Sequence, residues 1–199
     1  MSEKVRVNVF YGGFSSERSV SLETGRNVGN ALKKLGYPVK FVDVNRDFPD
    51  SPYGLDCDVA FIALHGEFGE DGGIQDVLES ADVPFTGSSA AASRLALNKV
   101  QAQRLFSFNG IPVPPSHSAR GREEVMALVR KVQGYPVIVK PAREGSTYGI
   151  SVVRRCEQLR SALERALEFD ELVLVEKFIE GREFTVGLVG SRALPVLES

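Results

Sequence analysis

Residues 5–13 read VRVNVFYGG, and this stretch decides the fold of the first half of the chain. Valine and aromatic residues dominate residues 5–11, a composition typical of a buried β-strand. The two glycines end the strand, and Ser19 or Ser21 can then cap a helix that stops near Gly36. A strand that leads directly into a helix is the repeating unit of a parallel sheet covered by helices.

The alternation of strand and helix continues beyond this unit. Further strands are predicted at residues 39–44, 59–64 and 83–85, and a short helix at residues 74–80. We therefore expect an α/β fold whose first domain is built on a parallel sheet. Loops at the carboxyl ends of such strands are the usual place for a ligand.

Two helices are predicted to bury apolar faces. The face of the first helix consists of Leu22, Val28, Ala31, Leu32 and Leu35. The second helix covers residues 89–109, and its expected core positions are Ala91, Leu95, Leu97, Val100, Leu105 and Phe106.

The composition changes from about Ser88 onward. A Pro-rich connector at residues 110–115 indicates a domain boundary between residues 88 and 115, and we divide the chain into domains 1–98 and 99–199. The second domain is predicted to be an α+β unit with largely antiparallel strands. Its helices are expected at residues 123–132 and 159–167, and its strands at residues 137–140, 150–153, 172–176, 184–189 and 193–197.

Composition and charge exclude several classes of protein. Apolar residues make up 43% and charged residues 25% of the 199 residues, the balance of an ordinary globular protein. The formal net charge of -2 gives no general attraction for nucleic acid or an anionic membrane, and no window has the ~18 apolar residues of a membrane span. Cys57 and Cys156 are too few for a disulfide framework or a zinc site, so we expect reduced thiols in a cytoplasmic protein.

The first stretch that can carry chemistry is GGFSSER at residues 12–18. Its glycines let the backbone turn sharply and approach a ligand closely. Glu17 stands where a carboxylate could meet a substrate ammonium, or where it simply complements the positive N-terminus of the following helix. On spacing alone the second interpretation is favoured.

The second stretch is HGEFGEDGGIQ at residues 65–75, directly after an apolar strand. His65 can donate to an anionic oxygen or move a proton, and Glu70 could orient such a group. The alternative is an acidic, flexible surface loop. Glycine-rich loops at strand ends tend to be active sites, which favours a functional role.

The third stretch is VKPAREGSTYG at residues 139–149. Backbone amides and hydroxyls beside its glycines can cradle phosphate oxygens, and Lys140 supplies positive charge. The order of residues differs from a Walker A loop. A tight β-hairpin with polar residues is the alternative.

The fourth stretch is LVEKFIEGRE at residues 174–183, where a strand ends in mixed polar and apolar residues. Such an edge can offer backbone groups to an adenine and apolar walls to its ring, and Glu176 or Glu183 could accept from ribose hydroxyls. Taken alone it is an ordinary strand, turn and strand. Lys99 is by default a solvated helix residue, unless it points at the same phosphate as Lys140.

Together and in this order, the motifs closely resemble those of the D-alanine–D-alanine ligases, which belong to the ATP-grasp enzymes. The resemblance runs from about Val5 to Ser199 and is carried by GGFSSERSVSL, ALHGEFGEDGGIQ, PFTGSS, NKVQAQ with GIPVPP, VIVKPAREGSTYGISVV and VEKFIEGREFTVGLVG. It implies a preATP-grasp, Rossmann-like first domain that binds the first D-alanine, followed by an α+β ATP-grasp domain.

The resemblance also implies a reaction, the ATP-dependent ligation of two D-alanines for peptidoglycan precursor synthesis. One D-alanine carboxylate takes the γ-phosphoryl of ATP, and the amine of the second attacks the acyl phosphate through a tetrahedral intermediate that expels phosphate. Catalysis there is mostly positioning and charge stabilisation. The implied partners are D-alanine, ATP with Mg²⁺ or Mn²⁺, and a second copy of the chain in a homodimer.

Site residues follow from the same resemblance. Glu17 is expected to bind the ammonium of the first D-alanine, Ser146 to link Glu17 to the phosphate loop, and His65 to neighbour the developing acyl phosphate. Val20 and Glu70 complete the D-alanine site. The ATP site is expected to comprise Lys99, Lys140, Glu144, Ser146, Thr147, Glu176, Lys177, Phe178, Ile179 and Glu183.

The sequence departs from the family pattern in two places and at its end. Asn98 stands where the family often has an acid, and Thr147 where a second serine is common. The family's closing Tyr loop, oxyanion Arg and magnesium ligands are expected beyond Ser199, so we expect no metal ligand here and a front part that is inactive alone. The alternatives are a naturally short, non-catalytic module that binds a nucleotide or amino acid, and a relative that joins D-alanine to D-lactate or D-serine.

Overall fold

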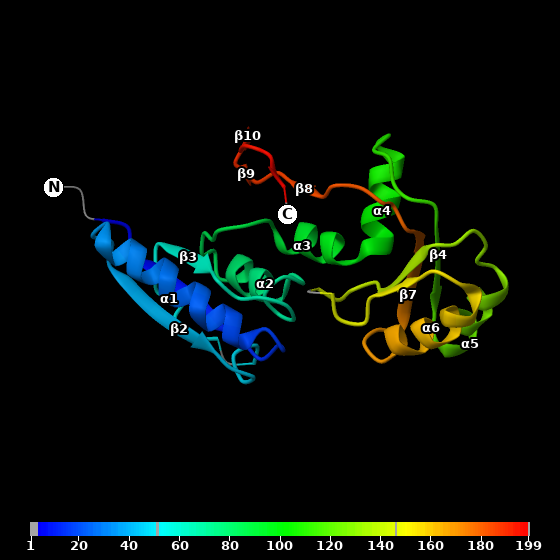
Figure 1. The fold of residues 1–199 in the computed structure, drawn as a ribbon. Coiled ribbons are helices and arrows are strands. Elements are labelled where there is room, and N and C mark those ends of the chain that lie inside the picture. The colour runs from blue at the N-terminus through cyan, green and yellow to red at the C-terminus, as the bar shows by residue number, and fades with distance from the viewer. Residues whose placement is uncertain (1–3, 51, 146, 199) are drawn as a thin grey trace. The chain divides into compact units, whose positions relative to one another are not determined.

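The computed structural model describes residues 4–50, 52–145 and 147–198, which divide into two compact units. Unit 1 comprises Met1–Pro112 and Pro141–Tyr148, and unit 2 comprises Val113–Lys140 and Gly149–Ser199 (Figure 1). The chain thus leaves unit 2 for a short segment and then returns to it. The proposed domain division between residues 98 and 99 stays a prediction.

Unit 1 is built on the parallel sheet that the sequence predicts. Its strands β1 (Val7–Gly12), β2 (Val39–Val44) and β3 (Val59–Ile62) lie in the order β2-β1-β3, and both pairings are parallel. The strand expected at residues 83–85 is reduced to a single parallel bridge between Phe85 and Ala60. The helices of this unit are α1 (Arg18–Lys34), α2 (Gly73–Ser80), α3 (Ala90–Leu97) and α4 (Lys99–Phe108).

Strand β1 is buried on both faces of the sheet. Val9 belongs to a core that includes Leu32 of α1, whereas Phe10 belongs to a second core that includes Ile74 of α2. Successive side chains of a strand point to opposite faces, so α1 and α2 cover opposite faces of the sheet. The carboxyl ends of β1 and β3 then lead into the two loops in which we expect ligand contacts.

The buried face of α1 differs from the predicted one. Ala31 is exposed and Leu35 is 67% exposed. A Cβ added to Gly25 would lie 2.4 Å from the Tyr11 side chain, and one added to Gly29 would lie 2.3 Å from the Phe41 ring. Aromatic rings from the sheet therefore fill the space beside the helix, and small residues form its fully buried stripe, namely Ser21, Gly25 and Gly29.

A single helix is predicted over residues 89–109, but the structure has two helices, α3 and α4, separated at Asn98. Asn98 has an extended backbone with ψ of 93°, and its side-chain oxygen caps α4 by accepting from the Gln101 amide at 3.2 Å. Leu105 and Phe106, expected in the core, are 44% and 46% exposed. The end of α4 therefore carries apolar side chains on its surface.

Unit 2 contains a four-stranded sheet in the order β4-β7-β5-β6. Pairs β4–β7 and β5–β6 are antiparallel. The strand at residues 116–120 is absent from the sequence prediction because SHSAR has no alternation of apolar residues. The strands are β4 (Ser116–Arg120), β5 (Val137–Pro141), β6 (Ser151–Val153) and β7 (Leu172–Lys177); the helices are α5 (Arg122–Ala127), η1 (Leu128–Arg130), η2 (Cys156–Gln158) and α6 (Leu159–Leu167).

Helices α5 and α6 supply the core on one face of this sheet. Leu163 of α6 packs in one cluster with Val139 of β5 and Val175 of β7. The alternation of side chains along β5 and β7 places Lys140 and Glu176 on the opposite face. That face is where the sequence predicts the nucleotide.

After residue 183 the strands are shorter than predicted. They are β8 (Phe184–Thr185), β9 (Leu188–Val189), β10 (Arg192–Ala193) and β11 (Leu197–Glu198). Strands β9 and β10 pair with each other, as do β8 and β11, both antiparallel. All of these strand residues are exposed.

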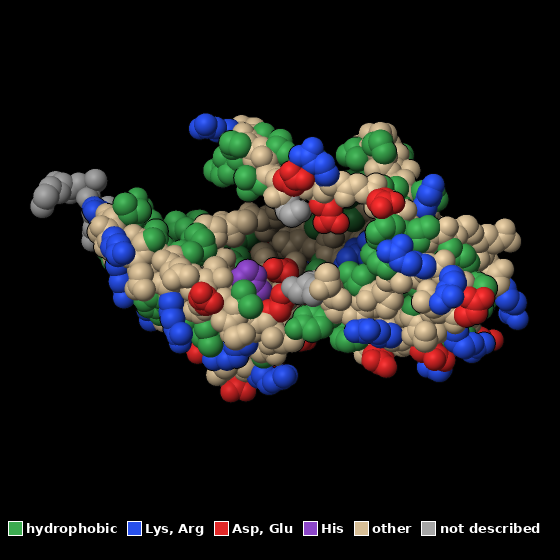
Figure 2. Space-filling view, in the orientation of Figure 1, with side chains coloured by type: hydrophobic (Ala, Val, Ile, Leu, Met, Phe, Trp, Pro, Cys, Tyr) green, Lys and Arg blue, Asp and Glu red, His purple; other side chains and the backbone are tan. Residues whose placement is uncertain are grey.

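The described residues contain no helix that is long and apolar enough to cross a membrane. On the face drawn in Figure 2, Lys and Arg side chains are interspersed with Asp and Glu side chains.

Candidate functional site

Arg18 and Ser21, both in α1, hold the loop after β1 in place. The Ser21 hydroxyl accepts from the Gly12 amide at 2.8 Å and donates to the Ala63 carbonyl at 2.7 Å. Arg18 donates to the Gly13 carbonyl and pairs with Asp43, both at 2.8 Å, and this pair raises the pKa of the Arg18 guanidinium. These contacts fix the start of α1 against the sheet.

The Glu17 carboxylate lies against the loop that follows β3. A Cβ added to Gly66 would lie only 2.7 Å from Glu17 Oε2. The Ser15 hydroxyl accepts from the Glu17 amide at 3.2 Å and donates to the His65 carbonyl at 2.8 Å. Contacts of the Ser15 and Glu17 side chains thus bring together the two sequence motifs that contain Glu17 and His65.

The acids of the 65–75 loop have different roles. Glu70 Oε1 lies 3.3 Å from His65 Nδ1. Asp71 instead accepts from the Phe68 amide at 3.0 Å and the Gly73 amide at 2.9 Å, and so shapes the turn before α2. Glu70 is therefore the acid of this loop within reach of the His65 ring, and its predicted role of orienting the ring stays a prediction, whereas Asp71 shapes the turn.

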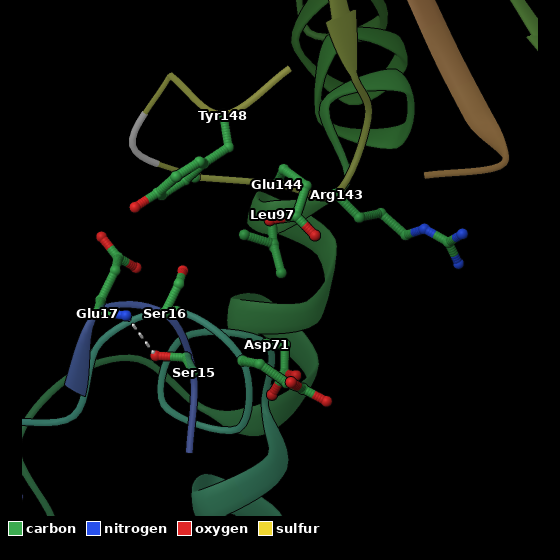
Figure 3. A pocket seen from close by; sticks show the side chains of 11 residues that line it. Ser15, Ser16, Glu17, Asp71, Leu97, Arg143, Glu144 and Tyr148 are labelled. Carbon is green, nitrogen blue, oxygen red and sulfur yellow. Dashed lines mark hydrogen bonds between the residues drawn. The ribbon is translucent and has the colours of Figure 1, made fainter. Parts of the chain in front are cut away.

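A pocket of about 390 Å³ lies within unit 1 (Figure 3). Glu17 and Glu144 are the predicted site residues among those that line it, and Gly66, next to His65, lines it as well. In Figure 3 the Glu17 carboxylate and the Tyr148 ring extend into the same side of this pocket. The complete lining is Ser15, Ser16, Glu17, Gly66, Glu67, Asp71, Leu97, Arg143, Glu144, Gly145 and Tyr148.

The pocket includes residues that sequence reasoning missed. Tyr148 belongs to the predicted phosphate loop, but the sequence predicts no role for it. Leu97 is predicted to lie in a helix core, yet it borders the pocket. Val20, predicted to bind substrate, is 52% exposed on α1 and lies outside this lining.

Segment Pro141–Tyr148 is tied to unit 1 by Lys99. The Lys99 amide donates to the Ala142 carbonyl at 2.9 Å, and the Lys99 ammonium donates to the Glu144 carbonyl. A Cβ added to Gly145 would lie 4.0 Å from Glu70 Oε2, so Glu70 faces this segment as well as His65. Thr147 has a φ of 63°, and Ser146 lies outside the described residues.

The predicted adenine end lies in unit 2. Lys140 and Glu176 form an ion pair in which Glu176 is only 4% exposed. The amides of Lys177 and Phe178 donate to the carbonyls of Pro115 and Pro136, at 2.9 and 3.1 Å. The side chains of the remaining predicted residues, Ile179 and Glu183, are exposed.

The structure thus groups the predicted residues into two sets. Unit 1 holds Glu17, Val20, His65, Glu70, Lys99, Glu144 and Thr147, and unit 2 holds Lys140, Glu176, Lys177, Phe178, Ile179 and Glu183. The sharing of one phosphate by Lys99 and Lys140 stays a prediction.

Comparisons with known proteins match both units. A family model described as D-ala D-ala ligase C-terminus matches residues 105–199, and one described as D-ala D-ala ligase N-terminus matches residues 48–88. A D-alanine–D-alanine ligase of Syntrophotalea carbinolica is 43% identical over 98% of this chain and 63% of its own length. The chain belongs to the D-alanine–D-alanine ligase family.

Solved structures of this ligase family agree in fold. The D-alanine–D-alanine ligase from Bacillus anthracis complexed with ATP is 30% identical, has a TM-score of 0.82, and is matched over 98% of this chain and 65% of its own. The D-Ala:D-Ser ligase VanG from Enterococcus faecalis is 27% identical with a TM-score of 0.84, over 98% of this chain and 70% of its own. The chain spans 61–63% of the length of curated ligases such as those of Syntrophotalea carbinolica and Geobacter sulfurreducens.

Proposed function

We propose that this chain provides the first-substrate site and much of the ATP grip of a D-alanine–D-alanine ligase. The observation that carries the proposal is the Glu17 carboxylate held against Gly66, in a pocket that segment 141–148 also lines. A carboxylate there can bind the ammonium of D-alanine. The substrate carboxylate would then extend toward the glycine-rich segment, where backbone amides suit phosphate oxygens.

The proposed reaction has two steps. A carboxylate oxygen of the first D-alanine bonds to the γ-phosphorus of ATP as the bond to the ADP oxygen breaks. The amine of the second D-alanine then attacks the acyl carbon, loses a proton, and expels phosphate. No residue of the chain forms a covalent bond to the substrates in these steps. The residues therefore act by positioning the reactants and stabilising charge. His65 stands beside the reacting carboxylate, and Glu70 orients the His65 ring. Val20 borders the substrate, and Ser146 connects Glu17 to the glycine-rich segment 141–148.

For ATP we propose contacts for residues of each set, as the family resemblance implies. Lys140 and Lys99 supply positive charge to the phosphates, and Glu176 accepts hydrogen bonds from the adenine or ribose end. Phe178 and Ile179 form apolar walls for the adenine ring. The other proposed contacts are Glu144 and Thr147 near the phosphates, Lys177 at the adenine and Glu183 at the ribose.

Magnesium or manganese would neutralise the charge of the ATP phosphates during transfer. Among the described residues, no group of three or more His, Cys, Asp and Glu side chains is arranged to hold a metal ion. The described residues therefore show no metal site of their own. Metal ligands after Ser199 stay a prediction.

The test is binding of D-alanine and of a non-hydrolysable ATP analogue, measured by calorimetry on Glu17→Gln. We expect D-alanine affinity to fall about tenfold or more, the scale of a lost charged hydrogen bond, with ATP affinity nearly unchanged. Glu23→Gln is the matched control, because Glu23 is exposed on the same helix and the charge change is equal. Equal losses of both ligands in Glu17→Gln would contradict the ammonium role.

Phosphate release from ATP, followed with D-alanine, D-serine or D-lactate as second substrate, separates the alternatives. Because the front part alone is expected to be inactive, the assay compares these 199 residues with a form that continues beyond Ser199. Release by the longer form with D-alanine supports a D-alanine–D-alanine ligase, and preference for D-serine or D-lactate would assign the chain to a related ligase. Binding without release by both forms would identify a non-catalytic binding module. We further propose that the protein is a cytoplasmic homodimer that serves peptidoglycan synthesis. Analytical ultracentrifugation, which measures the mass of the particle in solution, tests the dimer.

A further inference from the structure

The Thr24 side chain reaches the His65 ring. Thr24 lies in α1, is half-buried, and does not line the pocket that contains Glu17. Its hydroxyl oxygen lies 3.3 Å from His65 Nε2. The opposite ring nitrogen, Nδ1, lies 3.3 Å from Glu70 Oε1.

Glu17 and Thr24 contact consecutive residues of the loop after β3. Glu17 directly precedes α1, which begins at Arg18, and its carboxylate lies against Gly66. Thr24 lies in the second turn of α1 and meets the His65 ring. The start of α1 therefore contacts both Gly66 and His65.

The two partners of the ring determine where its proton lies. An ionised Glu70 can only accept a hydrogen bond, so Nδ1 must carry the hydrogen. In neutral His65 the other nitrogen, Nε2, is then an acceptor, and the Thr24 hydroxyl must donate to it. When the ring is protonated, Nε2–H donates and the same hydroxyl accepts. Thr24 can thus hold the ring in both protonation states.

The backbone beneath the ring is also fixed. The Ser15 hydroxyl donates to the His65 carbonyl at 2.8 Å, and the second Glu70 oxygen faces Gly145.

The contacts of the His65 ring with Thr24 and with Glu70, both 3.3 Å, are at the long end of the hydrogen-bond range. Such contacts often tighten when a substrate binds.

We infer that Thr24 is a positioning residue of the first-substrate site, which orients the His65 ring and keeps its Nε2 edge hydrogen-bonded. This inference rests on the proposed function, because it assigns Thr24 to the D-alanine site. A hydroxyl is required at this position, whereas the methyl group of threonine is not. Serine should therefore replace Thr24 without loss, and valine, which has the shape of threonine without the hydroxyl, should not.

The experiment uses the chain labelled with ¹⁵N in its two histidines, His65 and His117. Nitrogen chemical shifts distinguish N–H from lone-pair nitrogens and respond to a hydrogen bond at the lone pair. His117 lies in β4 of unit 2 and serves as the internal reference, assigned with His117→Gln. Spectra and D-alanine affinity are measured for wild type, Thr24→Val, Thr24→Ser and, should valine disturb folding, Thr24→Ala.

In wild type we expect His65 to carry its hydrogen on Nδ1 and to accept a hydrogen bond at Nε2. In Thr24→Val the Nε2 resonance should move to the position of an unbonded nitrogen while His117 stays unchanged. D-alanine affinity should fall about 2- to 10-fold, the scale of one hydrogen bond, with ATP-analogue affinity unchanged. Thr24→Ser should restore both readouts.

An unchanged Nε2 resonance in Thr24→Val would overturn the inference and leave the proposed function intact. A shifted resonance with unchanged D-alanine affinity would also overturn it, because Thr24 would then be only structural. A wild-type chain that fails to bind D-alanine would remove the proposed function, and the inference would fall with it.

Discussion

Gly66 decides where the Glu17 carboxylate can lie. It has a φ of +68°, and a Cβ there would lie 2.7 Å from Glu17 Oε2. We expect Gly66→Ala to lower the free energy of unfolding by about 1–2 kcal/mol through backbone strain. We also expect it to weaken D-alanine binding, because the carboxylate must move. Urea unfolding and calorimetry measure the two effects.

Gly110, which follows the end of α4, supplies the control for this substitution. Its φ is +73°, so alanine there also meets backbone strain, but a Cβ has nothing within 4 Å. Gly110→Ala should therefore lose stability and keep its D-alanine affinity. An equal loss of affinity in both variants would mean that strain, rather than displacement of Glu17, explains the result.

The Lys140–Glu176 pair allows stability and the proposed nucleotide binding to be tested together. Because Glu176 is 4% exposed, removing its cationic partner by Lys140→Met should destabilise the chain by about 3–5 kcal/mol. The double variant Lys140→Met/Glu176→Gln should regain most of that loss, since no buried charge remains. If the double variant is stable but binds the ATP analogue no more weakly than wild type, Lys140 has no phosphate role.

Single residues also show what the sequence can and cannot reveal about the site. His65 and Glu70 are predicted from the acids and glycines that follow an apolar strand, whereas the predicted role of Glu17 depends on the family resemblance, because its spacing alone favours a role at the helix N-terminus. Thr24 leaves no such mark, because its role depends on the pairing of α1 with a loop some forty residues later. Tyr148 is likewise revealed only by the path of segment 141–148.

Among the elements, α1 is held to the sheet by its glycines. A Cβ at Gly29 would lie 2.3 Å from the Phe41 ring. Overpacking costs about 1–3 kcal/mol, whereas replacing a helical glycine by alanine contributes about 1 kcal/mol through helix propensity. We therefore expect Gly29→Ala to be destabilising on balance and to lower the midpoint temperature of thermal unfolding.

Asn30 is the neighbouring control position in α1 and is exposed. Asn30→Ala gains helix propensity of about 0.5 kcal/mol without meeting the sheet, so its midpoint should rise slightly. A midpoint that rises in Gly29→Ala as well would show that Phe41 can move aside without loss.

The helices and strands that are predicted incorrectly from the sequence differ for physical reasons. Periodicity places Leu35 in the core of α1, but the large side chains at that contact come from the sheet and leave space only for glycine and serine. The long helix at residues 89–109 breaks because Asn98 caps α4 with its own side chain. Strands with apolar runs are found correctly, whereas β4, whose sequence is SHSAR, is defined by its partner β7.

For the whole molecule, the separate cores of unit 1 and unit 2 predict two separable unfolding units. Leu163 is fully buried in the core of unit 2, and Leu78 is fully buried in a core of unit 1. Substitution of either by alanine should cost about 2–5 kcal/mol locally. Hydrogen exchange followed by NMR should show that Leu163→Ala lowers amide protection in β7 and α6 but not in β1, and that Leu78→Ala does the reverse.

Segment Pro141–Tyr148 makes this prediction sharper, because its neighbours in sequence on both sides belong to unit 2. The Lys99 amide reports on it, since it donates to the Ala142 carbonyl at 2.9 Å. If the segment is a part of unit 1, Lys99 should keep its protection in Leu163→Ala and lose it in Leu78→Ala. Loss of Lys99 protection in Leu163→Ala would mean that the phosphate segment unfolds with unit 2, and that the pocket around Glu17 depends on both cores.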